Sequence, residues 1–282
     1  MDMMDGQQAT GAAAARTARG TLVVRLSPSS FSTVVLDGTD GGGGAVARRF
    51  VPDPAVSLVA NLKTAVVSCP CPQDGWGTID LVSCDGRVTF VPAGCFDRRT
   101  VAAMFDACFT LAGDEVVEVQ ELPSAGCVAL YAFNRFARRG MEAMATEVRT
   151  FNAYALLLDS MMAEASAQDG RVMRVHVSGE TMGVFVADGG RLVFANVFDC
   201  TEDNLRLFYL LHVLRAVGFS QLDDTIYISK EDGGASQLDR LAKLYVDDVR
   251  QMPVARPPFA VDGDGGCLTH DMAALLSSHR TN

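Results

Sequence analysis

The chain has 282 residues, a formal charge of −10 and a pI near 4.8. Apolar residues make up 49% and charged residues 21%, which is typical of a folded globular protein and excludes disorder of the whole chain. Nucleic-acid surfaces rely on clustered Lys and Arg, so an acidic chain with scattered arginine pairs argues against one. The length allows either one large domain or two lobes that each bury a core.

Membrane, secretion and metal signals are weak. No apolar run approaches the roughly 18 residues that a membrane-spanning helix needs, and Met1 to Gly20 lacks the apolar centre of a signal peptide. The eight cysteines are therefore expected as free thiols in a reducing cytosol. Cys69 and Cys71 have no second Cys/His pair at zinc-ligand spacing, so no metal site is predicted there.

The first half of the chain begins with residues 1–19, an Ala- and Gly-rich stretch that predicts a disordered leader. A helix with Val59, Leu62 and Val66 on one face is expected to start near Pro54, and a second helix at 99–111. Apolar alternation predicts strands at 21–27, 31–37, 45–51, 79–83, 87–91, 115–122 and 127–133.

The second half repeats this order. A helix at 151–165 is expected to join the halves, and helices are predicted at 202–217 and 237–248. Strands are predicted at 172–178, 181–187, 191–198 and 225–229. From residue 253 onward, Pro257–Pro258 and a glycine-rich run predict a flexible tail to 282, with at most one helical turn around Met272–Leu276.

These elements indicate an internal duplication with an offset of 172 − 21 = 151 residues. Each copy is a three-stranded antiparallel meander, then a helix, then a strand that needs a crossover, which predicts a mixed α/β sheet covered by helices. Duplicated, this resembles the ribonuclease H-like architecture in its actin-like form, with two lobes and a central cleft. We expect lobes at 20–150 and 151–252.

In actin-like proteins the turn between the first two strands of each lobe holds phosphate, with an Asp, then a Gly, then Ser or Thr. The carboxylate directs a metal, and the glycine lets backbone amides approach the phosphate. Here Arg25 stands at the first Asp position and His176 at the second, while Ser27 and Ser178 replace the glycines. Pro28 removes an amide donor as well. The resemblance therefore implies degenerate phosphate turns.

Some polar groups at these turns remain as candidate remnants of a binding cleft. They are Ser27, Ser29, Ser30, Ser178 and Thr181, with Gly233 and Gly234 as a candidate adenosine loop. The favoured alternative is structural: ordinary hairpin residues with Arg25 on a solvent face, and a glycine pair that only punctuates a loop. His176 is then a partly exposed sheet residue, and His212 a packed or edge-exposed residue on a helix that is apolar nearly all round.

Longer segments resemble domain-of-unknown-function family 3822, an uncharacterised bacterial family whose structural representative has an actin-like ATPase fold. The resemblance covers about residues 20–252 in preserved order. The matching stretches are Arg25-Leu26-Ser27 to Val35, Ser57 to Leu62, Phe90 to Asp97, Ala195 to Cys200, Phe208 to Leu211, and Gly218 to Ile228. It implies a fold and supplies no activity.

Two functions follow as hypotheses. The leading one is a non-catalytic actin-like interaction or scaffold protein of the bacterial cytoplasm, a pseudo-ATPase with no cofactor and with a protein partner that the sequence does not identify. The alternative is an actin-like ATPase or regulator that still binds ATP and magnesium weakly in the cleft. The sequence leaves the oligomeric state open.

Overall fold

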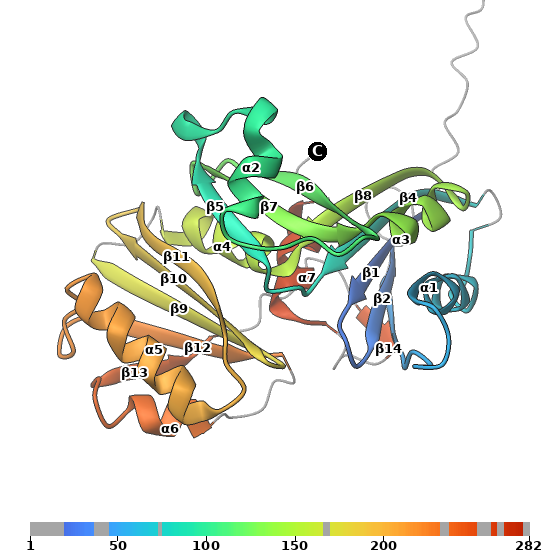
Figure 1. Ribbon diagram of the computed structural model, residues 1–282. Helices are drawn as coiled ribbons and strands as arrows, with labels where there is room; N and C mark the ends of the chain where they lie inside the picture. The colour runs from blue at the N-terminus through green and yellow to red at the C-terminus, as the bar shows by residue number, and fades with distance from the viewer. Residues whose placement is uncertain are drawn as a thin grey trace, which may run out of the picture.

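Two lobes of similar topology make up the computed structural model, which describes residues 20–36, 45–72, 75–165, 170–231, 237–252, 261–263 and 268–278 (Figure 1). The proposed leader and the Gly233–Gly234 pair lie outside these residues. No helix in the described part of the chain is long and apolar enough to cross a membrane.

The first lobe is built on a six-stranded sheet in the order β14-β3-β2-β1-β4-β8. β1 is antiparallel to β2 and parallel to β4, and β4 is parallel to β8. Helix α1, whose first turn is capped by the Ser57 side chain, connects β3 to β4. The bounds are β1 Gly20–Leu26, β2 Phe31–Leu36, β3 Ala45–Phe50, α1 Leu58–Val67, β4 Trp76–Ser83 and β8 Ala145–Asn152.

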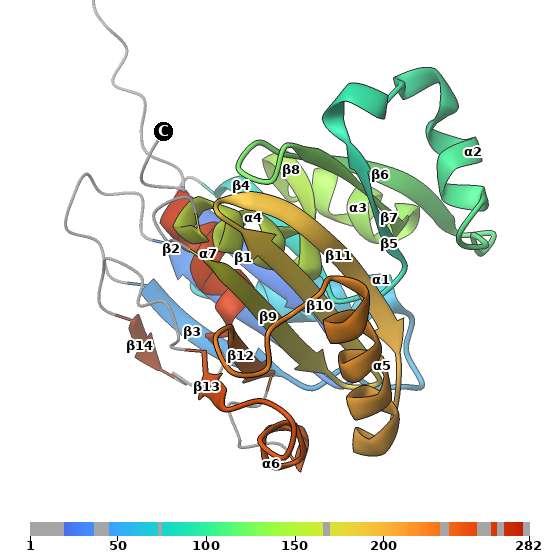
Figure 2. The same cartoon turned by 90° about the vertical axis from the view of Figure 1, so that its left-hand side faces the viewer.

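A smaller subdomain is inserted in the first lobe between β4 and β8, and it projects from the body of the molecule (Figures 1 and 2). Its three strands lie in the order β5-β7-β6 and pack on α2 around Phe105. Asn134 then caps α3, which leads back to β8. The bounds are β5 Val88–Pro92, α2 Val101–Asp106, β6 Glu115–Leu122, β7 Cys127–Asn134 and α3 Arg135–Glu142.

The second lobe has a five-stranded sheet in the order β11-β10-β9-β12-β13. This matches β3-β2-β1-β4-β8 of the first lobe strand for strand, with the same directions, so the predicted duplication is confirmed. Helices α5 and α6 cover one face of the sheet (Figure 1). The bounds are β9 Arg171–Ser178, β10 Thr181–Asp188, β11 Arg191–Asp199, α5 Asp203–Ala216, β12 Thr225–Lys230, α6 Gln237–Ala242 and β13 Asp248–Gln251.

Two helices lie between the sheets of the two lobes, α4 at Ala153–Ala165 and α7 at His270–Ser278 (Figure 1). Tyr154 and Leu158 of α4 join the large core that reaches from the first lobe to Phe185 of the second. Met272 of α7 packs against the other face of the first sheet, and the short strand β14, Val261–Gly263, adds to its edge.

The expectation of a flexible tail is wrong for 270–278. Met272, Leu275 and Leu276 are buried, and α7 is one of the two helices at the centre of the molecule. A nine-residue helix is marginal in isolation, so local propensity gave little sign of a helix that tertiary packing stabilises.

Boundaries also shift elsewhere. The helix predicted at 237–248 ends at Ala242 and is followed by the unpredicted strand β13. The helix predicted at 99–111 is shortened to Val101–Asp106, and α3 and β8 were not predicted at all.

Candidate functional site

Both turns that the resemblance assigns to phosphate face one cavity between the lobes, of about 1230 Å³. The first lobe contributes the β1–β2 turn and the loop after β4, and the second contributes the β9–β10 turn and the end of β12. The structure brings five of the seven candidate residues to this cavity: Ser27, Ser29, Ser30, Ser178 and Thr181. Gly233 and Gly234 are outside the described residues.

Arg25, near the end of β1, lies beneath this cavity in the seam between the lobes. Its Nε donates a hydrogen bond to Oδ2 of Asp271 at 2.8 Å, and its Nη1 donates to Oε1 of Glu231. Asp271 belongs to α7, and Glu231 follows β12 of the second lobe. Only 2% of the Arg25 side chain is exposed, so the expected solvent-facing position is wrong: α7 and the second lobe cover it.

All three members of this cluster are charged at neutral pH. Burial alone would lower the pKa of Arg25, but the carboxylates of Asp271 and Glu231 raise it above its ordinary value. Burial conversely favours the neutral form of both acids, yet the guanidinium of Arg25 holds the pKa of each below its usual range. Arg25 and the two carboxylates therefore stabilise each other's charged forms, and together they link the two sides of the seam.

His176 occupies the corresponding place in β9, and it is also buried, with 3% of its surface exposed. Burial lowers the pKa of His176 to about 4, so the ring is neutral at pH 7. Its Nδ1 lies 2.8 Å from Oγ of Ser229, whose own proton is donated to the Val175 carbonyl at 3.3 Å. Nδ1 is therefore assigned the hydrogen of the ring.

The expected partial exposure of His176 is wrong because helices α4 and α7 cover it. The rings of Tyr154 from α4 and His270 from α7 lie with their centroids 6.1 Å and 6.3 Å from the His176 ring. The polar–apolar alternation of β9 suggested an open face, but α4 and α7 lie over that face in the folded chain.

The hydroxyls of the second turn are engaged within the protein. Thr181 Oγ1 donates to the Ser178 carbonyl at 2.9 Å and lies 2.5 Å from the Tyr154 hydroxyl. Ser178 Oγ donates to the Glu231 carboxylate. In the first turn, the Ser27 amide closes the hairpin by donating to the Ser30 carbonyl at 3.1 Å, and Ser29 is exposed.

These residues do not fit a magnesium–nucleotide complex of the kind that the fold resemblance implies. The two positions for metal-directing carboxylates hold a cation, Arg25, and a neutral imidazole, His176. The nearby Glu231 is already paired with Arg25, and it would repel a triphosphate. Within the described ranges, no group of three or more His, Cys, Asp or Glu side chains could hold a metal ion.

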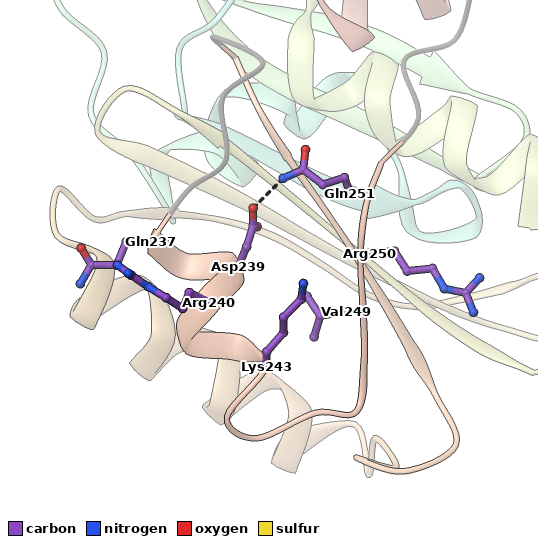
Figure 3. Close-up of a pocket in the computed structure, with 7 residues that line it drawn as sticks. All are labelled: Gln237, Asp239, Arg240, Lys243, Val249, Arg250 and Gln251. Carbon is purple, nitrogen blue, oxygen red and sulfur yellow. Dashed lines mark hydrogen bonds between the residues drawn. The ribbon is translucent and has the colours of Figure 1, made fainter.

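A second, smaller cavity of about 480 Å³ lies between α6 and β13 (Figure 3). Asp239 accepts a hydrogen bond from Gln251 at 2.7 Å, and Arg250 points away from Lys243 towards Asp248. Because its charged groups do not converge, this cavity is not a candidate site.

Two residues at the seam escaped the sequence reading. Asp271 lies in the stretch read as a flexible tail, and no motif marks it. In the sequence, Glu231 is only one of the charged residues between the strand predicted at 225–229 and the Gly233–Gly234 pair. A buried arginine needs acidic partners that are also buried. Had the sequence indicated that Arg25 is buried, that would have been the signal to look for acidic residues such as Glu231 and Asp271.

Comparison with solved structures establishes the fold. A Bacteroides thetaiotaomicron VPI-5482 protein with an actin-like ATPase fold and unknown function aligns at 20% identity, over 92% of this chain and 96% of that one, with a TM-score of 0.77. A chain of the PilM–PilN type IV pilus biogenesis complex aligns at 12% identity, over 92% and 98%, with a TM-score of 0.59. The search of curated proteins gives no match.

The chain therefore has an actin-like ATPase fold, as its sequence predicted. The family described as "Protein of unknown function (DUF3822)" matches residues 12–249, most of the chain, and the protein belongs to that family.

Proposed function

We propose that the protein is a non-catalytic interaction or scaffold protein of the cytoplasm that keeps the actin-like fold without its nucleotide chemistry. The observation that carries the proposal is the buried Arg25, paired with Glu231 and Asp271 at the position where the resemblance expects a metal-directing carboxylate.

The physical reason is that the ion pairs of Arg25 hold the two lobes together at the place where a nucleotide would otherwise bind. Arg25 joins β1 of the first lobe to the end of β12 in the second and to α7. Separating the lobes to admit a nucleotide would break the Arg25–Glu231 ion pair, because Glu231 belongs to the second lobe whereas α7, with Asp271, packs on the first sheet. The exposed carboxylate of Glu180 adds a further negative charge to the cavity wall.

Two observations support a protein partner and a reducing compartment. The PilM chain, which shares the fold, is found in a complex with PilN. In the described part of the chain the cysteines are free thiols, three of them exposed: Cys71, Cys95 and Cys108. Exposed thiols without disulfides suit a reducing cytoplasm.

A second candidate is an actin-like ATPase or regulator that binds ATP and magnesium weakly. What favours it is that both turns line a single cavity of about 1230 Å³, with Ser29 exposed at its wall. The two functions separate on affinity for nucleotide.

Isothermal titration calorimetry of the full chain with ATP and magnesium distinguishes them, with magnesium alone as the blank. The scaffold proposal expects no binding heat up to millimolar ATP. Tight binding would overturn it, while the absence of binding at millimolar ligand would exclude the alternative. Thermal unfolding with and without ATP gives an independent readout, since a ligand of the folded state raises the melting temperature.

A further inference from the structure

Four buried polar atoms at the seam between the lobes have no hydrogen-bond partner among the described residues. They are Nη2 of Arg25, Nε2 of His176, Oγ1 of Thr269 and Oδ1 of Asp271. Thr269, the most exposed of these four residues, is only 7% exposed. A buried polar group without a partner costs free energy, so native proteins almost always give such a group a protein or water partner. These four atoms therefore call for one.

The four atoms come from one region of the seam, at the start of α7. Arg25 and Asp271 are joined directly, because Nε of the guanidinium donates to the other carboxylate oxygen, Oδ2. The rings of His176 and of His270, the residue before Asp271, have their centroids 6.3 Å apart. Although burial alone would raise the pKa of Asp271, the other three residues lower it, Arg25 the most, so all three lie near its carboxylate. Thr269 is among them, although its hydroxyl does not reach the geometry of a direct hydrogen bond.

The unpartnered atoms include both donors and acceptors. Nη2 of Arg25 can only donate, and Oδ1 of the ionised Asp271 can only accept. Nε2 of the neutral His176 accepts, because Nδ1 carries the ring hydrogen. The hydroxyl of Thr269 can do either. A partner for this group must therefore both donate and accept hydrogen bonds.

Charge and size narrow the identity of that partner. A cation would lie against the guanidinium of Arg25, and an anion would lie against the carboxylates of Asp271 and Glu231. The partner is also small, because the protein already covers all four atoms almost completely. Water is neutral and small, and a buried water molecule forms about three hydrogen bonds to polar groups that would otherwise lack partners.

We propose that ordered water occupies this seam and bridges Arg25 of the first lobe to His176 of the second, with Asp271 and Thr269 completing its hydrogen bonds. The two equivalent positions of the duplication, which form no direct hydrogen bond with each other, are thus joined through solvent. Thr269 also lines the cavity between the lobes, so water reaches the seam from there. The proposal needs no ligand in the cavity, and its test is independent of the nucleotide titration.

A crystal structure of the full chain, at a resolution that shows ordered water, tests the proposal. We expect density for water within about 2.7–3.2 Å of Arg25 Nη2 and of His176 Nε2, through one molecule or two that bond to each other. Thr269→Val, which keeps the shape of the side chain and removes its hydroxyl, should retain this water, since three groups still hold it. An ion at the seam, no density there, or direct hydrogen bonds from these atoms to protein groups would overturn the proposal.

Nuclear magnetic resonance provides a test in solution. Water held inside the protein gives nuclear Overhauser peaks of the same sign as those between protein hydrogens. We expect such a peak between water and the carbon-bound hydrogen next to Nε2 of His176, in the wild type and in Thr269→Val. His212 is the matched control, because its ring is exposed and meets only rapidly exchanging surface water. Absence of the His176 peak from the wild type, or its loss in Thr269→Val, would contradict a held water.

Discussion

The two hairpin turns at the cleft have the same backbone role in the two lobes and different chemistry. Arg25 lies opposite Ser32 in the β1–β2 pair, and His176 lies opposite Gly183 in the β9–β10 pair. Arg25 is charged, and it reaches out of its lobe to Glu231 and Asp271. His176 is neutral and forms its hydrogen bond inside its own sheet, to Ser229.

The difference shows that the neighbouring side chains, more than burial, decide whether a residue at this position is charged or neutral. Both side chains are at most 3% exposed. Arg25 stays charged because two carboxylates converge on it, whereas His176 meets the hydroxyl of Ser229 and the rings of Tyr154 and His270, and is neutral. Arg25 thus links the two lobes by ion pairs, whereas His176, at the equivalent position of the second lobe, packs as a neutral buried residue.

The largest expected effect comes from breaking the tie at Arg25. Asp271→Ala leaves the buried guanidinium with only Glu231, and should lower the free energy of unfolding by about 3–5 kcal/mol. Urea unfolding measures this change. The triple variant Arg25→Met/Glu231→Gln/Asp271→Leu, which removes all three charges of the cluster, should recover much of the loss.

Arg99→Ala is the matched control for that prediction. Its ion pair with Asp97 joins two exposed side chains at 2.9 Å, and exposed pairs contribute little. Equal losses for Asp271→Ala and Arg99→Ala would contradict the role given to the seam.

A smaller effect is expected at Gly183, the residue opposite His176, where the first lobe has Ser32 opposite Arg25. A Cβ at Gly183 would lie 2.6 Å from Cδ1 of Tyr154, whose ring covers this part of β10. Gly183→Ala should therefore cost about 1–3 kcal/mol through overpacking, measured by thermal or urea unfolding.

Gly94→Ala provides the comparison, because a Cβ there meets nothing within 4 Å. The packing of α4 on β10 would need revision if both alanine variants were equally stable.

The smallest effect concerns pH and the neutral state of His176. Its pKa is near 6.5 in the unfolded chain and about 4 in the folded one, so the unfolded state takes up the proton first as the pH falls. The His176 contribution is fully present above about pH 6.5 and is lost towards pH 4. Between pH 8 and about pH 5.5 it should reduce stability by about 1 kcal/mol.

Urea unfolding at these two pH values, in wild type and His176→Gln, measures the difference. The variant should show a flatter pH dependence than the wild type. An unchanged slope in His176→Gln would mean that this ring does not carry the effect.

Much of the fold could be predicted from short-range pattern. Alternating runs such as Thr21 to Ser27 and Val172 to Ser178 identified the strands, and their repeat identified the two lobes. β8 and α3 were missed because Arg135 to Asn152 is rich in charged residues that pack only partly, so no clear apolar period marks it. The candidate hydroxyls lie at the cavity between the lobes, and their role as remnants of a binding site stays a prediction. Their internal hydrogen bonds could not be foreseen from spacing.

By itself the sequence determined the duplicated architecture, and it placed Arg25 and His176 where the resemblance expects acidic residues, because these are properties of local pattern and residue type. Only the tertiary structure decided what Arg25 and His176 do instead. Glu231 lies 206 residues from Arg25 along the chain, and Asp271 lies 246 residues away. No local period links such positions, and only the packing of α7 and of the second lobe against β1 turns a solitary arginine into the tie between the lobes.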